Sequence, residues 1–147
     1  MNEIRAKGAR THQGTSVVFG VLDAAHVLES RLEGALGKVG LSMAKVGVLD
    51  TLTKAPEPLT LGELAEKISC VRSNVTQLVD RLEAEGLVRR ISDPNDRRIR
   101  RAALTPTGRA ACAEGMRILV LEEQVVMSAL GQEDAPALLK VLRRLTP

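Results

Sequence analysis

The fold is decided by residues 59–90, which read LTLGELAEKISCVRSNVTQLVDRLEAEGLVRR. Thr60 and Glu63 have the spacing of a capping box, which marks the start of a helix. A short polar break at Ser69 leads into a second helix, and Gly86 is typical of the left-handed residue that ends one. Two helices joined by a short turn predict a helix-turn-helix.

A β-hairpin is expected directly after the second helix. Residues 88–92 and 99–104 form its strands, and Pro94 favours a type I turn over residues 93–96. The segment 89–101, RRISDPNDRRIRR, carries six arginines and two aspartates, so its net charge is +4, against +3 for the whole chain. Arginines on a projecting hairpin suit phosphate contact and insertion into a narrow minor groove. The alternative is a solvated edge that discourages strand-to-strand aggregation.

The helix over residues 72–85 is expected to have a polar outer face. Its apolar residues, Val75, Leu78, Val79 and Leu82, recur at the spacing of an inner face. The outer face carries short or planar hydrogen-bonding side chains that can pair with base edges in the major groove, although ordinary solvent exposure would also explain it. We expect DNA contacts from Arg72, Ser73, Asn74, Thr76, Gln77 and Arg81 in this helix, and from Arg90, Asp96, Arg97, Arg98 and Arg100 in the hairpin.

With these motifs, residues 41–108 resemble the multiple-antibiotic-resistance regulator (MarR) family of bacterial transcription factors. The stretch DPNDRRIRRAALTPTG (93–108) fits the family's wing signature, Asp-x-Arg followed by Leu-Thr-x-x-Gly. The signature positions are Asp96, Arg98, Leu104, Thr105 and Gly108.

The resemblance implies specific roles for the two motifs. Arg98 at the wing tip would enter the minor groove, Asp96 would orient its guanidinium, and the helix over 72–85 would lie in the major groove. Where relatives often have Gly-Val-Ser, this chain has Ser69-Cys70-Val71, so Ser69 or Ser73 is expected to cap that helix.

The expected fold is mainly α with a small β-hairpin wing (α+β), a winged helix-turn-helix between dimerisation helices. The parts are a flexible basic tail (1–15), an N-terminal dimerisation helix (16–40), the winged domain (41–105) and C-terminal dimerisation helices (106–147). The long helix from residue 106 to 130 is apolar on two faces, more than one chain can cover. We therefore expect a homodimer on a palindromic operator, with half-sites about one helical turn apart.

Composition excludes several classes of protein. No run approaches the roughly 18–20 apolar residues of a membrane span, and two cysteines do not make a disulfide framework, so we expect a cytoplasmic protein. The single aromatic residue, Phe19, argues against binding by stacked aromatic side chains. No phosphate loop, nucleophile motif or paired metal motif appears, so neither an enzyme nor a cofactor is expected. Asp23 and His26 could supply two metal ligands, but no metal site is predicted.

The resemblance also implies a small-molecule effector that binds between the dimerisation helices and the winged domains and releases the DNA from a repressor. By family architecture alone, the candidate lining residues are Val18, Leu22, His26, Leu49 and Met116. Cys70, in the turn before the helix over 72–85, is an alternative redox sensor. Two other functions stay open: an architectural DNA-binding protein without a ligand, and a module whose arginine hairpin docks an acidic partner.

Overall fold

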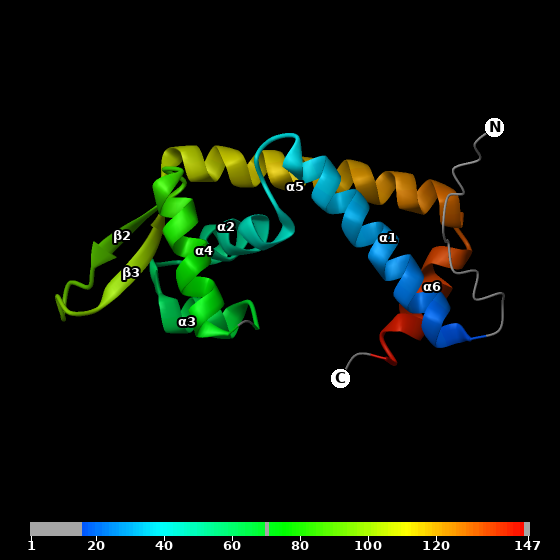
Figure 1. The fold of residues 1–147 in the computed structure, drawn as a ribbon, viewed down its shortest axis with the longest axis horizontal. Coiled ribbons are helices and arrows are strands. Elements are labelled where there is room, and N and C mark those ends of the chain that lie inside the picture. Colours follow the sequence, from blue (N-terminus) through cyan, green and yellow to red (C-terminus); the bar gives the residue numbers. More distant parts are fainter. Residues whose placement is uncertain (1–15, 70, 146–147) are drawn as a thin grey trace, which may run out of the picture.

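The structure, a computed structural model, describes residues 16–69 and 71–145 (Figure 1). It confirms a mainly helical fold with a small antiparallel sheet of strand order β1-β3-β2. The elements of the described residues are α1 (Val17–Gly37), α2 (Met43–Lys54), β1 (Leu59–Thr60), α3 (Leu61–Lys67), α4 (Arg72–Ala84), β2 (Val88–Ser92), β3 (Arg100–Leu104), α5 (Pro106–Leu130) and α6 (Asp134–Leu142). The proposed tail, residues 1–15, lies outside the described residues. None of the helices described is both long and apolar enough to span a bilayer.

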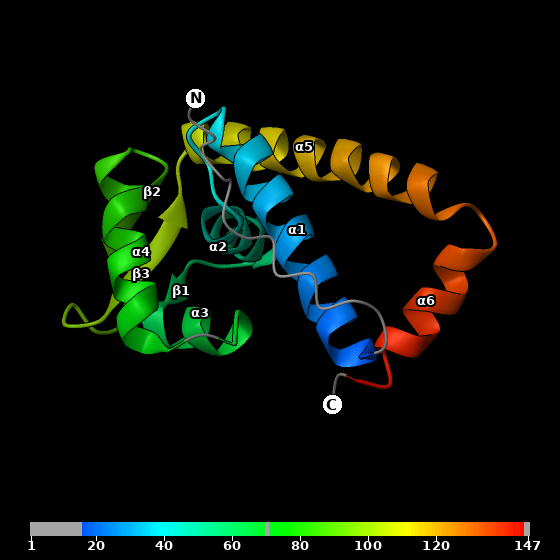
Figure 2. The ribbon, with the colours of Figure 1, turned by 45° about the vertical axis from the view of Figure 1, so that its right-hand side comes forward.

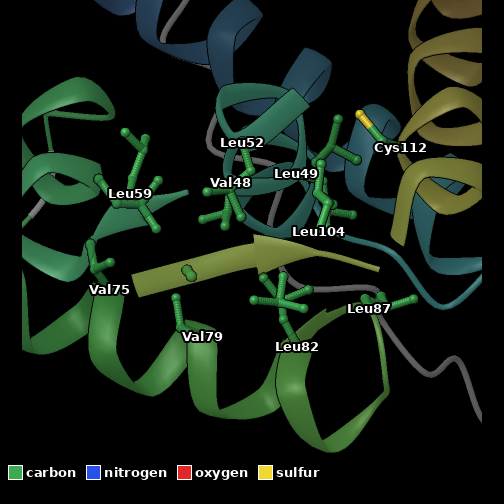
Figure 3. Packing of buried hydrophobic residues seen from close by; sticks show 14 of the residues in the cluster. Val48, Leu49, Leu52, Leu59, Val75, Val79, Leu82, Leu87, Leu104 and Cys112 are labelled. Carbon is green, nitrogen blue, oxygen red and sulfur yellow. The ribbon is translucent and has the colours of Figure 1, made fainter. Parts of the chain in front are cut away.

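The hydrophobic core lies in the middle of the chain, between α2, α3, α4 and the sheet (Figure 3). Val75, Val79 and Leu82 of α4 are fully buried, as their spacing predicts, and Leu78 is partly buried against the same cluster. Burial of these side chains holds α4 by its apolar side, so its polar side is turned outward.

Side-chain caps begin three of the six helices described, α2, α3 and α5. The Ser42 side chain accepts a hydrogen bond from the backbone of Lys45 and begins α2. Thr60 and Glu63 form both bonds of the capping box at α3. The start of α4 differs from our expectation: its N-cap is Val71, so neither Ser69 nor Ser73 occupies that position. Ser69 instead has a left-handed backbone (φ +51°), which turns the chain between α3 and α4.

The wing turn also differs from the expected type I turn over residues 93–96. The Asp93 carboxylate, in a residue only 5% exposed, accepts hydrogen bonds from the backbone of Asn95 (2.7 Å) and Asp96 (3.2 Å). Because a side chain closes this part of the loop, the tight backbone turn forms further on, where the Ile99 amide donates to the Asp96 carbonyl at 3.0 Å. Residues 97 and 98 therefore occupy the corner of the wing.

The start of α5 is packed closely against the turn between α4 and β2. Thr105 Oγ1 accepts from the Gly108 amide (2.9 Å) and donates to the Gly86 carbonyl (2.7 Å). A Cβ atom placed on Gly108 would lie 1.9 Å from the carbonyl oxygen of Leu87. This contact explains physically why threonine and glycine stand three residues apart in the Leu-Thr-x-x-Gly motif.

Most of α1, the far half of α5 and all of α6 extend away from the core, with α6 at the opposite end of the molecule from the wing (Figures 1 and 2). An apolar stripe of the last helix is exposed in this single chain: Leu138 is 40% exposed and Val141 52%. Ala135 is the buried residue of α6. The stripe is exposed because the described elements of one chain do not cover it, and the same holds for much of α1 and the far half of α5.

Candidate nucleic-acid interface

The polar face of α4 is open to solvent, as the sequence predicts. Its residues Arg72, Ser73, Asn74, Gln77 and Arg81 are exposed. Thr76 is half-buried, and its hydroxyl donates to the Arg72 carbonyl at 3.0 Å, so it is turned along the helix. α4 and the wing lie together at one end of the molecule (Figures 1 and 2). The fold thus presents a polar helix and an arginine-rich hairpin side by side.

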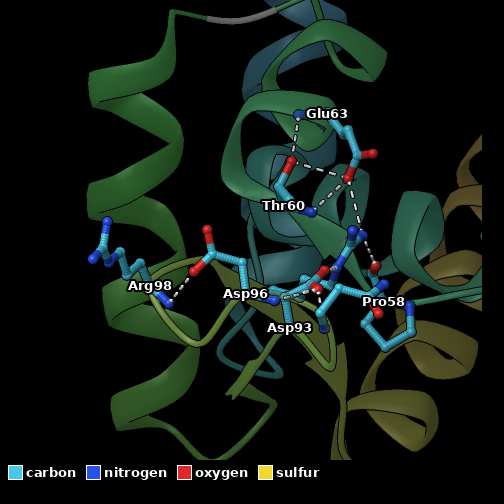
Figure 4. A network of polar contacts seen from close by, with 8 residues as sticks. Pro58, Thr60, Glu63, Asp93, Asp96 and Arg98 are labelled. Carbon is cyan, nitrogen blue, oxygen red and sulfur yellow. Dashed lines mark hydrogen bonds and ion pairs between the residues drawn. The ribbon is translucent and has the colours of Figure 1, made fainter.

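The wing tip carries exposed arginines. Arg97 and Arg98 stand at the corner of the turn, and Arg100 donates to the Ser92 hydroxyl at 3.0 Å across the two strands. The Asp96 carboxylate accepts a hydrogen bond from the backbone amide of Arg98 at 2.9 Å, whereas the Arg98 guanidinium points away from it (Figure 4). Asp96 therefore holds the main chain of Arg98 in this structure, in place of the expected contact with the guanidinium.

Arg90 is bound to α4. Its guanidinium contacts Asp80 Oδ1 at 2.5 Å and Glu83 Oε2 at 2.7 Å, and its backbone amide donates to the second Glu83 oxygen at 2.9 Å. Although burial by itself lowers the pKa of the Arg90 guanidinium, the hydrogen bonds to the two carboxylates raise that pKa overall. Arg90 thus ties β2 to the exposed face of α4.

Arg101 was not among the expected contact residues, yet it is the most highly connected arginine of the hairpin. It forms an ion pair with Asp93, donates to the Pro58 carbonyl at 3.0 Å and contacts Glu63 Oε2 at 3.4 Å. The Arg101 guanidinium beside Asp93 lowers the pKa of that carboxyl group below its usual value. Of the six arginines counted in the hairpin, Arg90 and Arg101 are therefore engaged with acids of the same chain.

The candidate effector residues are not gathered in one place. Leu49 is completely buried in the core, whereas Val18 and Leu22 are 65% and 58% exposed near the start of α1, at the end close to α6 (Figures 1 and 2). His26 and Met116 are also exposed.

A different cavity, of about 350 Å³, lies between α1, the start of α2 and α5. An ion pair between Arg31 and Glu122 lies at its edge. The lining residues are Leu28, Arg31, Leu32, Met43, Leu119, Glu122, Glu123 and Val126. The cavity is therefore mainly apolar.

Cys70 lies outside the described residues. Cys112 is buried, and its sulfur accepts a hydrogen bond from the Thr53 hydroxyl at 3.6 Å. Within residues 16–69 and 71–145, no three His, Cys, Asp or Glu side chains gather in a way that could hold a metal ion.

The same motifs are matched in known proteins. Residues 41–99, which hold the helix-turn-helix and most of the wing, match the family model described as the MarR family. The chain is 30% identical to the transcriptional regulator BldR from Sulfolobus solfataricus, over 88% of this chain and 91% of that one, with a TM-score of 0.68. The chain belongs to the MarR family.

Two further MarR-family comparisons extend this result. The transcriptional repressor CouR, solved with a 23-mer DNA duplex, shares 26% identity, with a TM-score of 0.80 over 90% of this chain and 93% of that chain. The uncharacterized HTH-type regulator YcgE of Bacillus subtilis is 44% identical over 66 residues, which are 45% of this chain and 42% of YcgE. The chain matches less than half the length of YcgE.

Proposed function

We propose that this MarR-family protein is a sequence-specific regulator of transcription in the cytoplasm that binds double-stranded DNA, as a homodimer and repressor. The observation that carries the proposal is the pairing of an exposed polar face on α4 with an exposed arginine turn at the tip of the wing. A helix of this kind fits the major groove, and an arginine turn beside it reaches the adjacent minor groove. The duplex bound to CouR supports the same assignment by analogy of fold.

Each expected contact residue takes a role in this proposal. Gln77 and Arg72 read base edges, and Ser73, Asn74, Thr76 and Arg81 contact bases or phosphates nearby. Arg98 enters the minor groove, while Arg97 and Arg100 contact phosphates. Asp96 fixes the main chain of Arg98, and Arg90 acts by orienting α4, since its guanidinium already binds two carboxylates.

Replacement of Arg98 by alanine tests the wing assignment. We expect the dissociation constant on a duplex selected by the protein from a randomised pool to rise by an amount equivalent to about 1–3 kcal/mol. Arg117→Ala is the matched control, because Arg117 is an exposed arginine on α5 paired with Glu114, away from the wing. Normal binding by the Arg98 variant would refute the assignment of the wing.

The same assay distinguishes the regulator from its alternatives. At about 150 mM salt a regulator prefers its selected duplex over a scrambled one by roughly 10³-fold or more. Equal binding to both would favour an architectural protein, and no binding to either would favour docking of an acidic partner.

Exposed apolar side chains on the extended helices support the homodimer. Val120, Leu121, Val125 and Met127 of α5 are all 41–50% exposed. Burying apolar surface contributes about 25 cal/mol per Å², so a second copy that covers these faces is strongly favoured over water. We expect Val125→Glu to shift the protein from dimer to monomer in sedimentation and to weaken operator binding. A wild-type chain that sediments as a monomer would contradict this part of the proposal.

The cavity between α1, α2 and α5 is the proposed effector site, in place of the residues expected from the sequence. It lies where the extended helices join the winged domain, so a small apolar molecule there would alter the angle between them. We expect such a molecule to raise the thermal midpoint and to weaken operator binding, and Leu119→Trp, which fills the cavity, to abolish both responses. Ligands that act equally on this variant would place the effector elsewhere.

A further inference from the structure

We propose that Arg101 is a positioning residue for DNA binding, which sets the angle of the wing relative to the helix-turn-helix. This inference rests on the proposed function. In this proposal Arg101 makes no contact with DNA; it holds the wing so that Arg98 meets the minor groove while α4 occupies the major groove.

The first argument is the set of partners that one guanidinium joins. Arg101 lies on β3 and binds Asp93 in the wing loop, the carbonyl of Pro58 before β1, and Glu63 in the first turn of α3. Figure 4 labels these three partners. These partners come from three separate segments of the chain. A planar guanidinium with several fixed donors can hold such partners in one geometry, which a flexible lysine cannot.

The second argument is that these contacts continue to the wing tip. Asp93 accepts from the amide of Asp96, and Asp96 accepts from the amide of Arg98. At the other end, Glu63 accepts from the Thr60 amide at 2.7 Å as part of the capping box. An unbroken path of polar contacts therefore runs from the start of α3 through Arg101 to the main chain of Arg98.

The third argument is the direction in which Arg101 faces. In the strand register, Arg90 pairs with Ala102 and Arg101 pairs with Ile91. Successive residues of a strand point to opposite faces, so Arg101 and Arg90 lie on opposite faces of the sheet, and Arg90 is the one bound to α4. The side chain of Arg101, 25% exposed, thus lies on the sheet face turned away from α4, where it contacts Asp93, Pro58 and Glu63.

Substitution of Asp93 distinguishes a positioning role of Arg101 from a simple effect of charge on DNA affinity. Asp93→Asn removes a negative charge close to a polyanion, and charge alone predicts tighter binding to DNA. Loss of the Arg101 contact predicts the opposite, because the wing is no longer held. We expect Asp93→Asn and Arg101→Gln each to raise the dissociation constant on the selected duplex about fivefold or more. Arg101→Lys, which keeps the charge, is expected to restore only part of the affinity.

A control and a double-mutant cycle complete the test. Glu57→Gln removes an exposed acid near Arg101 and is expected to leave binding unchanged or slightly tighter. If Arg101 acts through Arg98, Arg98→Ala costs less in the Asp93→Asn background than in the wild type, with a coupling of about threefold or more. Circular dichroism and sedimentation establish that each variant is folded and assembled, and Asp93→Asn carries the test if Arg101→Gln does not fold.

Two results would overturn the inference: wild-type or tighter binding by folded Asp93→Asn, or an equal cost of Arg98→Ala in both backgrounds. Failure of the proposed function looks different, because the wild-type chain itself would then show no preference for the selected duplex over a scrambled one.

Discussion

Gly108→Ala perturbs the closest backbone contact described at the start of α5. The added Cβ would lie 1.9 Å from the Leu87 carbonyl oxygen, and it must retreat by at least 1.1 Å to reach 3.0 Å, the lower limit for such contacts. The obstacle is backbone, so a change of side-chain rotamer does not relieve it. Separation also weakens the hydrogen bond that this carbonyl accepts from the Thr105 amide at 3.2 Å.

These contributions can be added. The hydrogen bond is worth about 1 kcal/mol and overpacking costs about 1–3 kcal/mol, while alanine gains about 1 kcal/mol over glycine within a helix. We therefore expect Gly108→Ala to lower the free energy of unfolding by about 1–3 kcal/mol, measured by urea denaturation followed by circular dichroism at fixed protein concentration.

Gly47→Ala is the matched control. Gly47 lies within α2, and a Cβ there meets nothing within 4 Å, so the same substitution is expected to stabilise the protein by about 0.4–1 kcal/mol. If Gly108→Ala is as stable as the wild type while Gly47→Ala behaves as expected, the close packing of α5 on Leu87 is wrong.

Three further predictions concern the winged domain. Thr60→Ala removes the capping box at α3 and is expected to cost about 1 kcal/mol in urea denaturation, and no loss would show that the cap is dispensable. Leu64→Ala, at a completely buried position, is expected to lower the free energy of unfolding by about 2–5 kcal/mol in the same measurement. A change near zero would contradict the burial of Leu64 in the core. Because folding lowers the pKa of Asp93, its contribution to stability is present above the ordinary pKa of about 3.9 and is lost as the pH falls below it. The stability advantage of the wild type over Asp93→Asn is therefore expected to shrink as the pH falls below about 5 and to go on shrinking below about pH 3, and a constant difference would contradict the ion pair with Arg101.

The parts of the fold that the sequence predicts well are those decided by neighbours along the chain. A capping box needs only Thr60 and Glu63 in adjacent turns, and the inner face of α4 follows from the spacing of Val75, Val79 and Leu82. Both are confirmed. The start of α4 was missed because the turn is made by a left-handed Ser69, a residue type that offers no special signal for that conformation.

The pairing of charges could not be predicted, because it depends on contacts between distant segments. The sequence shows six arginines in the hairpin but not that Arg101 meets Glu63 and Pro58, which lie 38 and 43 residues earlier. The short strand β1, which brings that segment beside β3, was missed for the same reason. Alternation along β3 was the available signal, since it places Arg100 and Arg101 on opposite faces.

The length of α5 gives the close packing at Gly108 a mechanical consequence. Its 25 residues form a rod of about 37 Å, joined at one end directly to β3 and fixed there against Leu87. A tilt of α5 by only about 5° about that fixed end moves its far end by about 3 Å. A small rotation at the first turn of α5 therefore corresponds to a large displacement at its last turn. A displacement of the end of α5 near α6 would thus change the orientation of the distant wing through rotation of the helix alone.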